Sequence, residues 1–294
     1  MSKYSIEQFS EITGLNKILI RTWENRYNFI EPKRTSTNIR YYDDTMLVKG
    51  IKYSILVKNG YKISKLVNHN EKHISQLIEE TLKITSNLNK KNDIYISKFL
   101  ESAILFNQLL FDKTYKSCIK NLGIVNFYKD VLIKTMNQIS ILFLNSKITP
   151  ANEHFLSENI RVKIGYEIEK IKNKTLSRKK WVLFLPENEY HDIGLLFTHL
   201  ILKIKNYKVI YLGQNVPREN LLSFNNKDTN LFFFLNTDRN ENFSNKLCSF
   251  LKKNIKQSQI YVVDKQECID KKYSNIIKIK NIDQFINLLN IEEG

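Results

Sequence analysis

The sequence has little cysteine and no long apolar run. Its three cysteines, Cys118, Cys248 and Cys268, show no CxxC or Cys/His spacing. Neither a disulfide framework nor a zinc site is therefore indicated. The longest apolar runs, 141–144 and 231–235, are far too short to cross a bilayer, and the N-terminus lacks the layout of a signal peptide. We expect a cytoplasmic protein that does not enter a membrane.

Positive charge is in excess. The chain carries 46 Lys and Arg against 30 Asp and Glu, a formal net charge of +16. Such a molecule attracts polyanions, so DNA, RNA or an anionic membrane surface are favoured as partners over acidic metabolites. An AT-rich genome would also produce abundant Lys and Asn without any binding function. Charge alone therefore does not select the partner.

Three segments differ in composition, with boundaries that we place at 1–75, 76–175 and 178–294. The middle segment has apolar residues at helical spacing, which predicts a four-helix bundle. In the last segment, β-rich runs alternate with helices, which predicts a doubly wound, Rossmann-like or flavodoxin-like parallel sheet of five strands. The expected strands are 181–185, 209–212, 231–235, 260–263 and 276–279. Such sheets bind ligands at the carboxyl ends of their strands.

The first segment has the pattern of a winged helix-turn-helix. Ser5 is a suitable N-cap for a first helix, and Gly14 can end that helix. A second helix follows at once, with Trp23 and Tyr27 as expected core contacts. Two short helices joined by a tight turn, the second one cationic, are typical of a helix-turn-helix. After Pro32, basic and tyrosine residues flank a polar turn, as in a β-hairpin wing.

The string RTWENRYNFIEPKRTSTNIRYYDD, residues 21–44, resembles the signature of MerR-family regulators. The resemblance covers about the first seventy residues and implies binding to double-stranded DNA, with Lys17 and Arg21 on or near the recognition helix. It also implies that residues of the wing contact the DNA backbone, because guanidinium groups and tyrosine hydroxyls suit phosphate oxygens. The predicted DNA-binding residues are Lys17, Arg21, Arg26, Arg34, Arg40, Tyr41 and Tyr42.

A second motif follows the first expected strand. His191 lies at the start of a helix, whose dipole disfavours the imidazolium and leaves a nitrogen available to ligate a metal. Glu189 could accept the other ring N–H and fix the tautomer. Gly194, in the first helical turn, would let a bulky cofactor approach the backbone. The alternative is that this histidine is only structural or surface-exposed.

The ExHxxG spacing of Glu189, His191 and Gly194 resembles the cobalamin-binding motif of methionine synthase-type domains, whose histidine is the lower cobalt ligand. The chain has the helix-turn-helix segment, which we call the head, then the helical bundle and then this domain. This order is similar to that of light-responsive, adenosylcobalamin-binding repressors of the CarH and LitR type. The resemblance implies adenosylcobalamin or methylcobalamin as cofactor and His191 as the cobalt ligand. It also implies an upper-face cap in the bundle, formed by Glu153 and His154 with Phe143 at the family's tryptophan position. Glu153 falls on an apolar helix stripe, where an unpaired carboxylate would be costly.

The sequence departs from that family at several positions. Leu144 stands where a light-sensing relative carries a histidine, which argues against a light response. Asn236 and Thr237 replace the residues expected after the third strand. Asp264 replaces one of two glycines expected after the fourth strand, so its side chain could obstruct the slot for the nucleotide tail.

The main hypothesis is a MerR-type transcriptional regulator, not an enzyme, whose C-terminal half senses a corrinoid and controls oligomerisation. We expect a homo-oligomer, a dimer or tetramer, since MerR-type heads read palindromic sites. One alternative keeps DNA binding but makes the C-terminal half a cofactor-free oligomerisation or protein-docking module. A remote alternative is a corrinoid carrier or methyltransferase component. A phosphate-binding Rossmann enzyme is disfavoured because no GxGxxG follows the first strand.

Overall fold

The computed structural model describes residues 3–144, 148–172, 179–235, 241–264, 269 and 276–292. Contacts divide the chain into two units, Met1–Glu158 and Asn159–Gly294. The head and most of the helical segment share the first unit, and the second contains a parallel sheet. The three boundaries expected from the sequence stay a prediction.

The first unit begins with a winged helix-turn-helix, whose local signals act as the sequence predicts. Ser5 and Gln8 form a capping box at the start of the first helix, and Gly14, with φ 68°, ends it. Asn16 caps the second helix, and Asp43 caps the third by accepting from Met46 N. The elements are α1 (Ile6–Thr13), α2 (Lys17–Tyr27), β1 (Lys33–Arg34), β2 (Arg40–Tyr41), α3 (Asp44–Lys58), α4 (Ile63–Leu66) and α5 (Glu71–Ile84).

The core of the head is aromatic. Trp23 packs edge-on against Phe29 at a centroid distance of 5.3 Å, and Phe9 packs against Tyr42 at 4.5 Å. Helix α3 passes so close to α1 that a Cβ at Gly50 would overlap Phe9 and Thr13. Gly50 therefore permits the contact that sets the first helix against the third.

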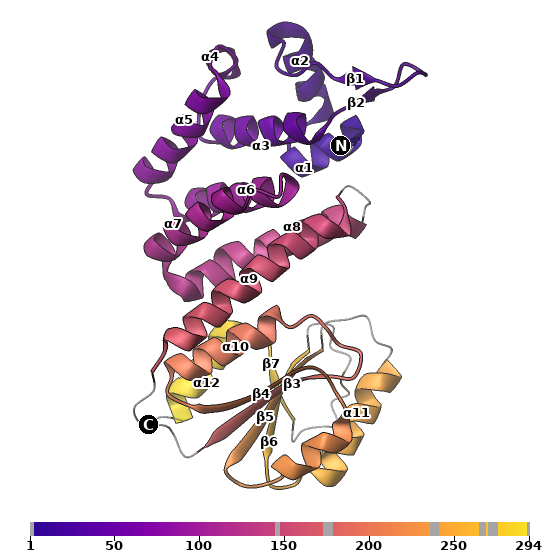
Figure 1. Ribbon diagram of the computed structural model, residues 1–294, viewed down its shortest axis with the longest axis vertical. Coiled ribbons are helices and arrows are strands. Elements are labelled where there is room, and N and C mark those ends of the chain that lie inside the picture. Colours follow the sequence, from indigo (N-terminus) through magenta and orange to yellow (C-terminus); the bar gives the residue numbers. More distant parts are fainter. Residues whose placement is uncertain are drawn as a thin grey trace. The chain divides into compact units, whose positions relative to one another are not determined.

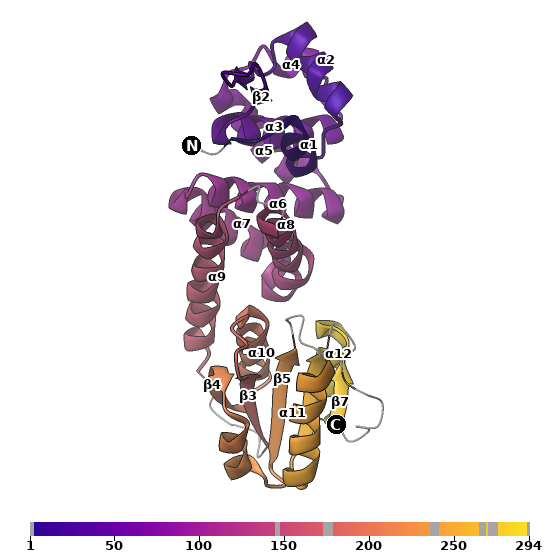
Figure 2. The ribbon, with the colours of Figure 1, turned by 90° about the vertical axis from the view of Figure 1, so that its right-hand side faces the viewer.

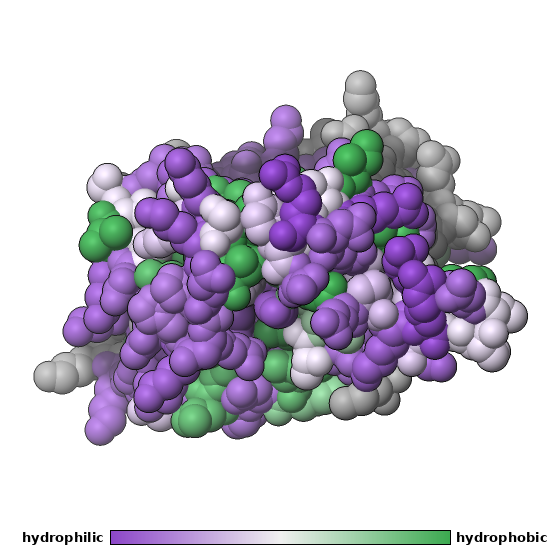
Figure 3. Space-filling model, turned by 90° about the horizontal axis from the view of Figure 1, so that it is seen from above, coloured by the Kyte–Doolittle hydropathy of each residue, from purple (hydrophilic) through white to green (hydrophobic). Residues whose placement is uncertain are grey.

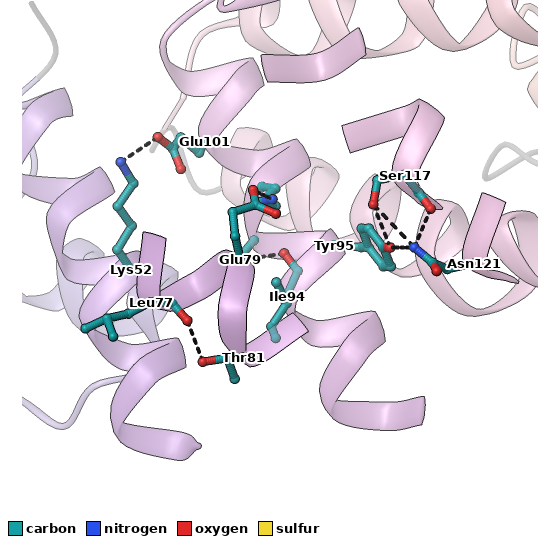
Figure 4. A network of polar contacts seen from close by, with 11 residues as sticks. Lys52, Leu77, Glu79, Thr81, Ile94, Tyr95, Glu101, Ser117 and Asn121 are labelled. Carbon is teal, nitrogen blue, oxygen red and sulfur yellow. Dashed lines mark hydrogen bonds and ion pairs between the residues drawn. The ribbon is translucent and has the colours of Figure 1, made fainter. Parts of the chain in front are cut away.

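Helices continue the first unit as α6 (Leu88–Ile104), α7 (Gln108–Asn126), the π-helical turn η1 (Phe127–Leu132), α8 (Ile133–Leu144) and α9 (Pro150–Lys170), which crosses the unit boundary (Figure 1). Asn87 caps α6, which begins at Leu88. Lys52 of α3 and Glu101 of α6 form an ion pair of 2.9 Å with both side chains nearly buried (Figure 4). Burial raises the pKa of Glu101, and Lys52 opposes that shift. The pair ties the head to the helix that follows it.

The second unit holds a five-stranded, all-parallel sheet in the order β4-β3-β5-β6-β7. Its strands are β3 (Lys180–Pro186), β4 (Lys208–Val216), β5 (Thr229–Leu235), β6 (Gln259–Asp264) and β7 (Ile276–Ile279). These contain every expected strand. The direction of strand addition reverses between β3 and β5, which makes their carboxyl ends the topological switch point.

Helices cover both faces of this sheet. α10 (Ile193–Ile204) and α12 (Ile282–Glu292) lie on one face, while η2 (Arg218–Phe224) and α11 (Glu241–Asn254) lie on the other (Figure 2). Trp181, fully buried on the first face, packs edge-on against Phe285 of α12 at 5.5 Å. On the second face, Phe184 and Phe233 stack beneath the apolar side of α11. This is the predicted doubly wound architecture.

Within the described ranges, no helix combines the length and the apolar character that a bilayer crossing requires.

Candidate functional site

The recognition helix presents the cationic side chains that the sequence assigns to it. Lys17, Arg21 and Arg26 of α2 are all exposed. Lys17 Nζ lies 3.4 Å from Glu7 Oε1, and the Arg26 guanidinium lies over the Tyr27 ring. Seen from the side of α2 and the wing, the surface is mostly hydrophilic with scattered apolar side chains (Figure 3). The exposed cationic side chains of α2 on this side suit a phosphate backbone.

Ile18 was missed by the sequence argument. Its side chain is 75% exposed in the first turn of α2, between the two cationic residues Lys17 and Arg21. An exposed isoleucine at this position can contact a thymine methyl group in the major groove. Ile18 and Ile20 are two positions apart on a helix, so their side chains point in different directions. Since Ile20 is buried, this spacing in the sequence could have indicated that Ile18 is exposed.

The wing is a two-stranded hairpin whose turn is held by one of the predicted DNA-binding residues. Arg34 Nη1 donates to Asn38 O at 3.1 Å and to Asn38 Oδ1 at 2.9 Å. Asn38 has φ 63°, a left-handed conformation that asparagine tolerates. Arg40 is exposed beside it, and Tyr41 is half-buried beneath Lys3. Arg34 and Arg40 thus occupy the exposed edge of the hairpin.

The structure corrects the assignment of Tyr42. This residue is fully buried, its backbone pairs with Tyr4, and its hydroxyl donates to Glu24 Oε1 at 2.5 Å. Burial and the Glu24 contact raise the pKa of Tyr42. The prediction that Tyr42 contacts DNA was wrong, because neighbouring residues of a strand point to opposite sides and Tyr42 takes the inner one.

The base of the wing is fixed by Asp43. Its carboxylate accepts from Lys33 Nζ at 2.8 Å, from Thr45 Oγ1 at 2.6 Å and from Met46 N at 3.0 Å. Burial would raise the pKa of Asp43, but these donors outweigh it and lower the pKa to about 2. One carboxylate therefore caps α3 and anchors β1.

The second candidate site is the loop between β3 and α10. Glu189 is fully buried, and its Oε1 accepts from the backbone N–H groups of Tyr190 and His191 at 3.0 Å each. The same oxygen lies 2.8 Å from His191 Nδ1, while the His191 side chain is 71% exposed. Because a carboxylate only accepts, a neutral imidazole here carries its hydrogen on Nδ1 and its lone pair on Nε2. The histidine is oriented as a metal ligand requires.

Bonds to the end of β4 hold this loop in place. Asn188 N donates to Asn215 Oδ1 at 2.8 Å, and Gln214 Nε2 donates to Tyr190 O at 2.8 Å. Asn188 and Asn215 both have positive φ, and Gly213 has φ 78°. The conformation of the loop is thus specified by residues 24 and 27 positions away along the chain.

The start of α10 lies next to the histidine. Asp192 Oδ1 accepts from Arg161 Nε at 2.7 Å, with both side chains largely buried. The carbonyl of Gly194 accepts from Thr198 Oγ1 at 2.9 Å, and Gly194 is itself only half-buried. Arg161 was not identified from the sequence, since its partner lies on a different element.

Asp264 does not point into open space at the carboxyl end of β6. Its side chain is 2% exposed, its Oδ2 accepts from Ile269 N at 2.9 Å, and Lys278 Nζ lies 4.0 Å away. The expectation that this carboxylate obstructs a cofactor slot is therefore not supported. Asn236 and Thr237 lie outside the described residues.

The predicted upper cap is described in part. Glu153 is half-buried and His154 is exposed on α9, while Ser157 and Ile160 continue the stripe and are buried. The side chains of Phe143 and Leu144 lie outside the described residues. Glu153 and His154 belong to a different unit from His191, so their shared site stays a prediction.

Comparisons with known proteins bear on both candidate sites. Residues 4–68 match the model of the MerR HTH family regulatory protein. The chain begins with a MerR-type helix-turn-helix domain. Over 225 residues it is 25% identical to the HTH-type transcriptional repressor CarH of Myxococcus xanthus, covering 74% of this chain and 73% of that repressor. Both matches are to regulators rather than enzymes, as the sequence predicts.

The fold of much of the chain also has a solved counterpart. The monomethylamine corrinoid protein of Methanosarcina barkeri superimposes with a TM-score of 0.54 at 15% identity, covering 68% of this chain and 99% of that structure. At this identity the likeness shows the fold alone. It confirms the predicted combination of helices with a Rossmann-like sheet.

Proposed function

We propose that this chain is a DNA-binding transcriptional regulator whose C-terminal unit binds a cobalamin, with His191 as the lower ligand of cobalt. The contact between Glu189 Oε1 and His191 Nδ1, 2.8 Å long beneath an exposed imidazole, carries the proposal. It supplies a fixed tautomer and a nitrogen directed away from the carboxylate. The position at the switch point of the sheet is where doubly wound folds bind ligands.

The donor set favours a metal that arrives in a preformed complex. Among the described residues, no group of three or more His, Cys, Asp or Glu side chains could hold a bare metal ion. A corrin ring supplies the equatorial nitrogens itself and needs one protein nitrogen at most. A single oriented histidine therefore fits a corrinoid better than a free ion.

DNA binding is assigned to the MerR-type head. Lys17, Arg21 and Arg26 on α2 and Arg34 and Arg40 on the wing present exposed guanidinium and ammonium groups. These five residues, with the half-buried Tyr41, form the proposed DNA surface. A palindromic operator would bring two heads together, so the proposal includes a homo-oligomer on DNA.

The cofactor assignment is tested by incubating the purified chain with adenosylcobalamin and desalting it, in the dark and after illumination. The wild type is expected to retain a visible absorption spectrum, and His191→Ala to lose most of it. A colourless wild type would overturn the assignment and favour the cofactor-free oligomerisation or docking module. A colourless protein that still binds DNA would leave the assignment of the head intact.

A further inference from the structure

A cavity of about 490 Å³ lies inside the first unit, where the head meets the helices that follow it. Its walls come from α1, α3, α6 and α8. This volume is within the range of small-molecule sites, roughly 300–1,000 Å³. None of the described residues that line it is assigned to DNA or cobalamin.

The buried part of the cavity is mainly apolar and its rim is polar. Its buried apolar residues are Ile51, Ile55, Ile96, Leu100 and Leu142, and the buried hydroxyl residues Thr13, Ser54 and Ser97 also line it. The rim carries the exposed residues Glu11, Lys58, Asp93 and Gln138. Since the rim holds charges of both signs, it does not select strongly for an anion or a cation. An apolar site with a few polar groups is the usual composition of a small-molecule pocket.

Ser54 gives an independent indication of a ligand. It lines the cavity from α3 and is 2% exposed, and its Oγ has no hydrogen-bond partner in the described part of the chain. Leaving a buried hydroxyl unsatisfied destabilises the folded state, so such groups call for an explanation. A ligand with a hydrogen-bonding group would satisfy this hydroxyl.

We propose that this cavity binds an uncharged, mainly apolar small molecule that carries one hydrogen-bonding group, which pairs with Ser54. This site is separate from His191 and does not depend on cobalamin binding. Its walls join the first helix of the DNA-binding motif to α6 and α8. The ligand therefore contacts the head and the helical segment at once, across the junction that also holds the Lys52–Glu101 ion pair.

The test uses N-phenyl-1-naphthylamine, a neutral fluorescent probe with two aromatic groups and one N–H, excited directly and titrated with the full-length chain. We expect saturable binding to the wild type. Gln138→Trp, which places an indole at the mouth from an exposed position, is expected to weaken binding about tenfold, equivalent to 1.4 kcal/mol. Asn137→Trp is the matched control: Asn137 is also exposed on α8 but does not line the cavity.

A second variant separates a ligand role from a structural one. Ser54→Ala removes the unpaired hydroxyl, so it should raise the midpoint of thermal unfolding while weakening probe binding about threefold, the loss of one ordinary hydrogen bond. Absence of saturable binding would overturn the proposal. Equal affinities of Gln138→Trp and Asn137→Trp would also overturn it, because the probe would then bind elsewhere.

Discussion

Oε1 of Glu189 lies 2.8 Å from Nδ1 of His191 and also accepts both backbone N–H groups that follow it. One buried oxygen thus fixes the loop and the histidine ring together. The arrangement makes Glu189 a positioning residue for His191, with consequences for both ligand affinity and loop order.

Glu189→Gln should weaken adenosylcobalamin binding by about tenfold, because it removes the negative charge behind the metal-bound histidine, and mutation of such a partner typically costs 10–100-fold in affinity. The amide keeps the shape and one acceptor oxygen, so the fold should persist. Visible absorption titration measures the affinity. Glu187→Gln, two residues earlier and partly exposed, is the control and should bind like the wild type. Equal affinities of both variants would show that Glu189 does not act through His191.

Tyr42→Phe should destabilise the head by about 1–3 kcal/mol, because it leaves the buried Glu24 carboxylate without its hydroxyl donor. Urea unfolding followed by circular dichroism checks this. Tyr41→Phe, on the adjacent and partly exposed residue, should change stability by less than about 0.5 kcal/mol. The reverse ranking of the two variants would contradict the inward placement of Tyr42.

Arg40→Gln should make the negative slope of log K against log salt less steep by about one, as expected for the loss of one phosphate contact. Fluorescence anisotropy at several salt concentrations measures it, with a duplex selected from random sequences. Arg218→Gln alters a half-buried arginine of the second unit and has the same charge change. If both variants change the slope alike, the effect comes from net charge and the wing is not the contact.

Ile18 predicts a contact with a thymine methyl group, worth about 0.8 kcal/mol if one methyl-sized group is buried. Ile18→Ser should weaken binding to the selected duplex without changing thermal stability. Replacing thymine by uracil at the contacted position removes the same methyl from the DNA. The wild type should lose affinity on that replacement and the variant should not, whereas additive losses would refute the contact.

The environment of His199 predicts that the free energy of unfolding decreases at acidic pH. Burial, and secondarily Lys203, lowers the pKa of His199 from 6.5 to about 4, and its ring stacks on Tyr211. Between these values the unfolded chain binds a proton that the native chain does not, so the free energy of unfolding falls as pH drops from about 6.5 to about 4. His199→Gln should reduce the slope of the free energy of unfolding against pH, measured by urea unfolding. His73→Gln, which replaces an exposed histidine of α5, should leave this slope unchanged. An unchanged slope in His199→Gln would contradict a neutral, half-buried imidazole.

Local signals made much of the fold predictable. The expected strand 276–279 coincides with β7, since polar residues bound the apolar run on both sides. Ser5 and Gly14 delimit α1 as expected, because caps act within one helical turn. The spacing of Glu189 and His191 was enough to predict their contact, since the two residues share one short loop.

Features that depend on tertiary packing were not predictable in this way. Two consecutive tyrosines, Tyr41 and Tyr42, give no indication of which one faces inward until the strand is placed against the head. Ile204 continues an apolar stripe in the sequence but is 45% exposed at the end of α10. The cavity around Ser54 forms only where α1, α3, α6 and α8 pack together. The periodic pattern of apolar residues in the sequence does not specify how these helices approach one another.

The most direct test of the account is the affinity of the full-length chain for its selected DNA duplex, measured by anisotropy with and without adenosylcobalamin, in the wild type and in His191→Ala. We expect both proteins to bind the duplex without the cofactor. Adenosylcobalamin should change the Kd of the wild type about fivefold or more, the usual size of allosteric coupling, and leave His191→Ala unchanged. A wild type whose Kd is the same with and without bound cobalamin would contradict the account.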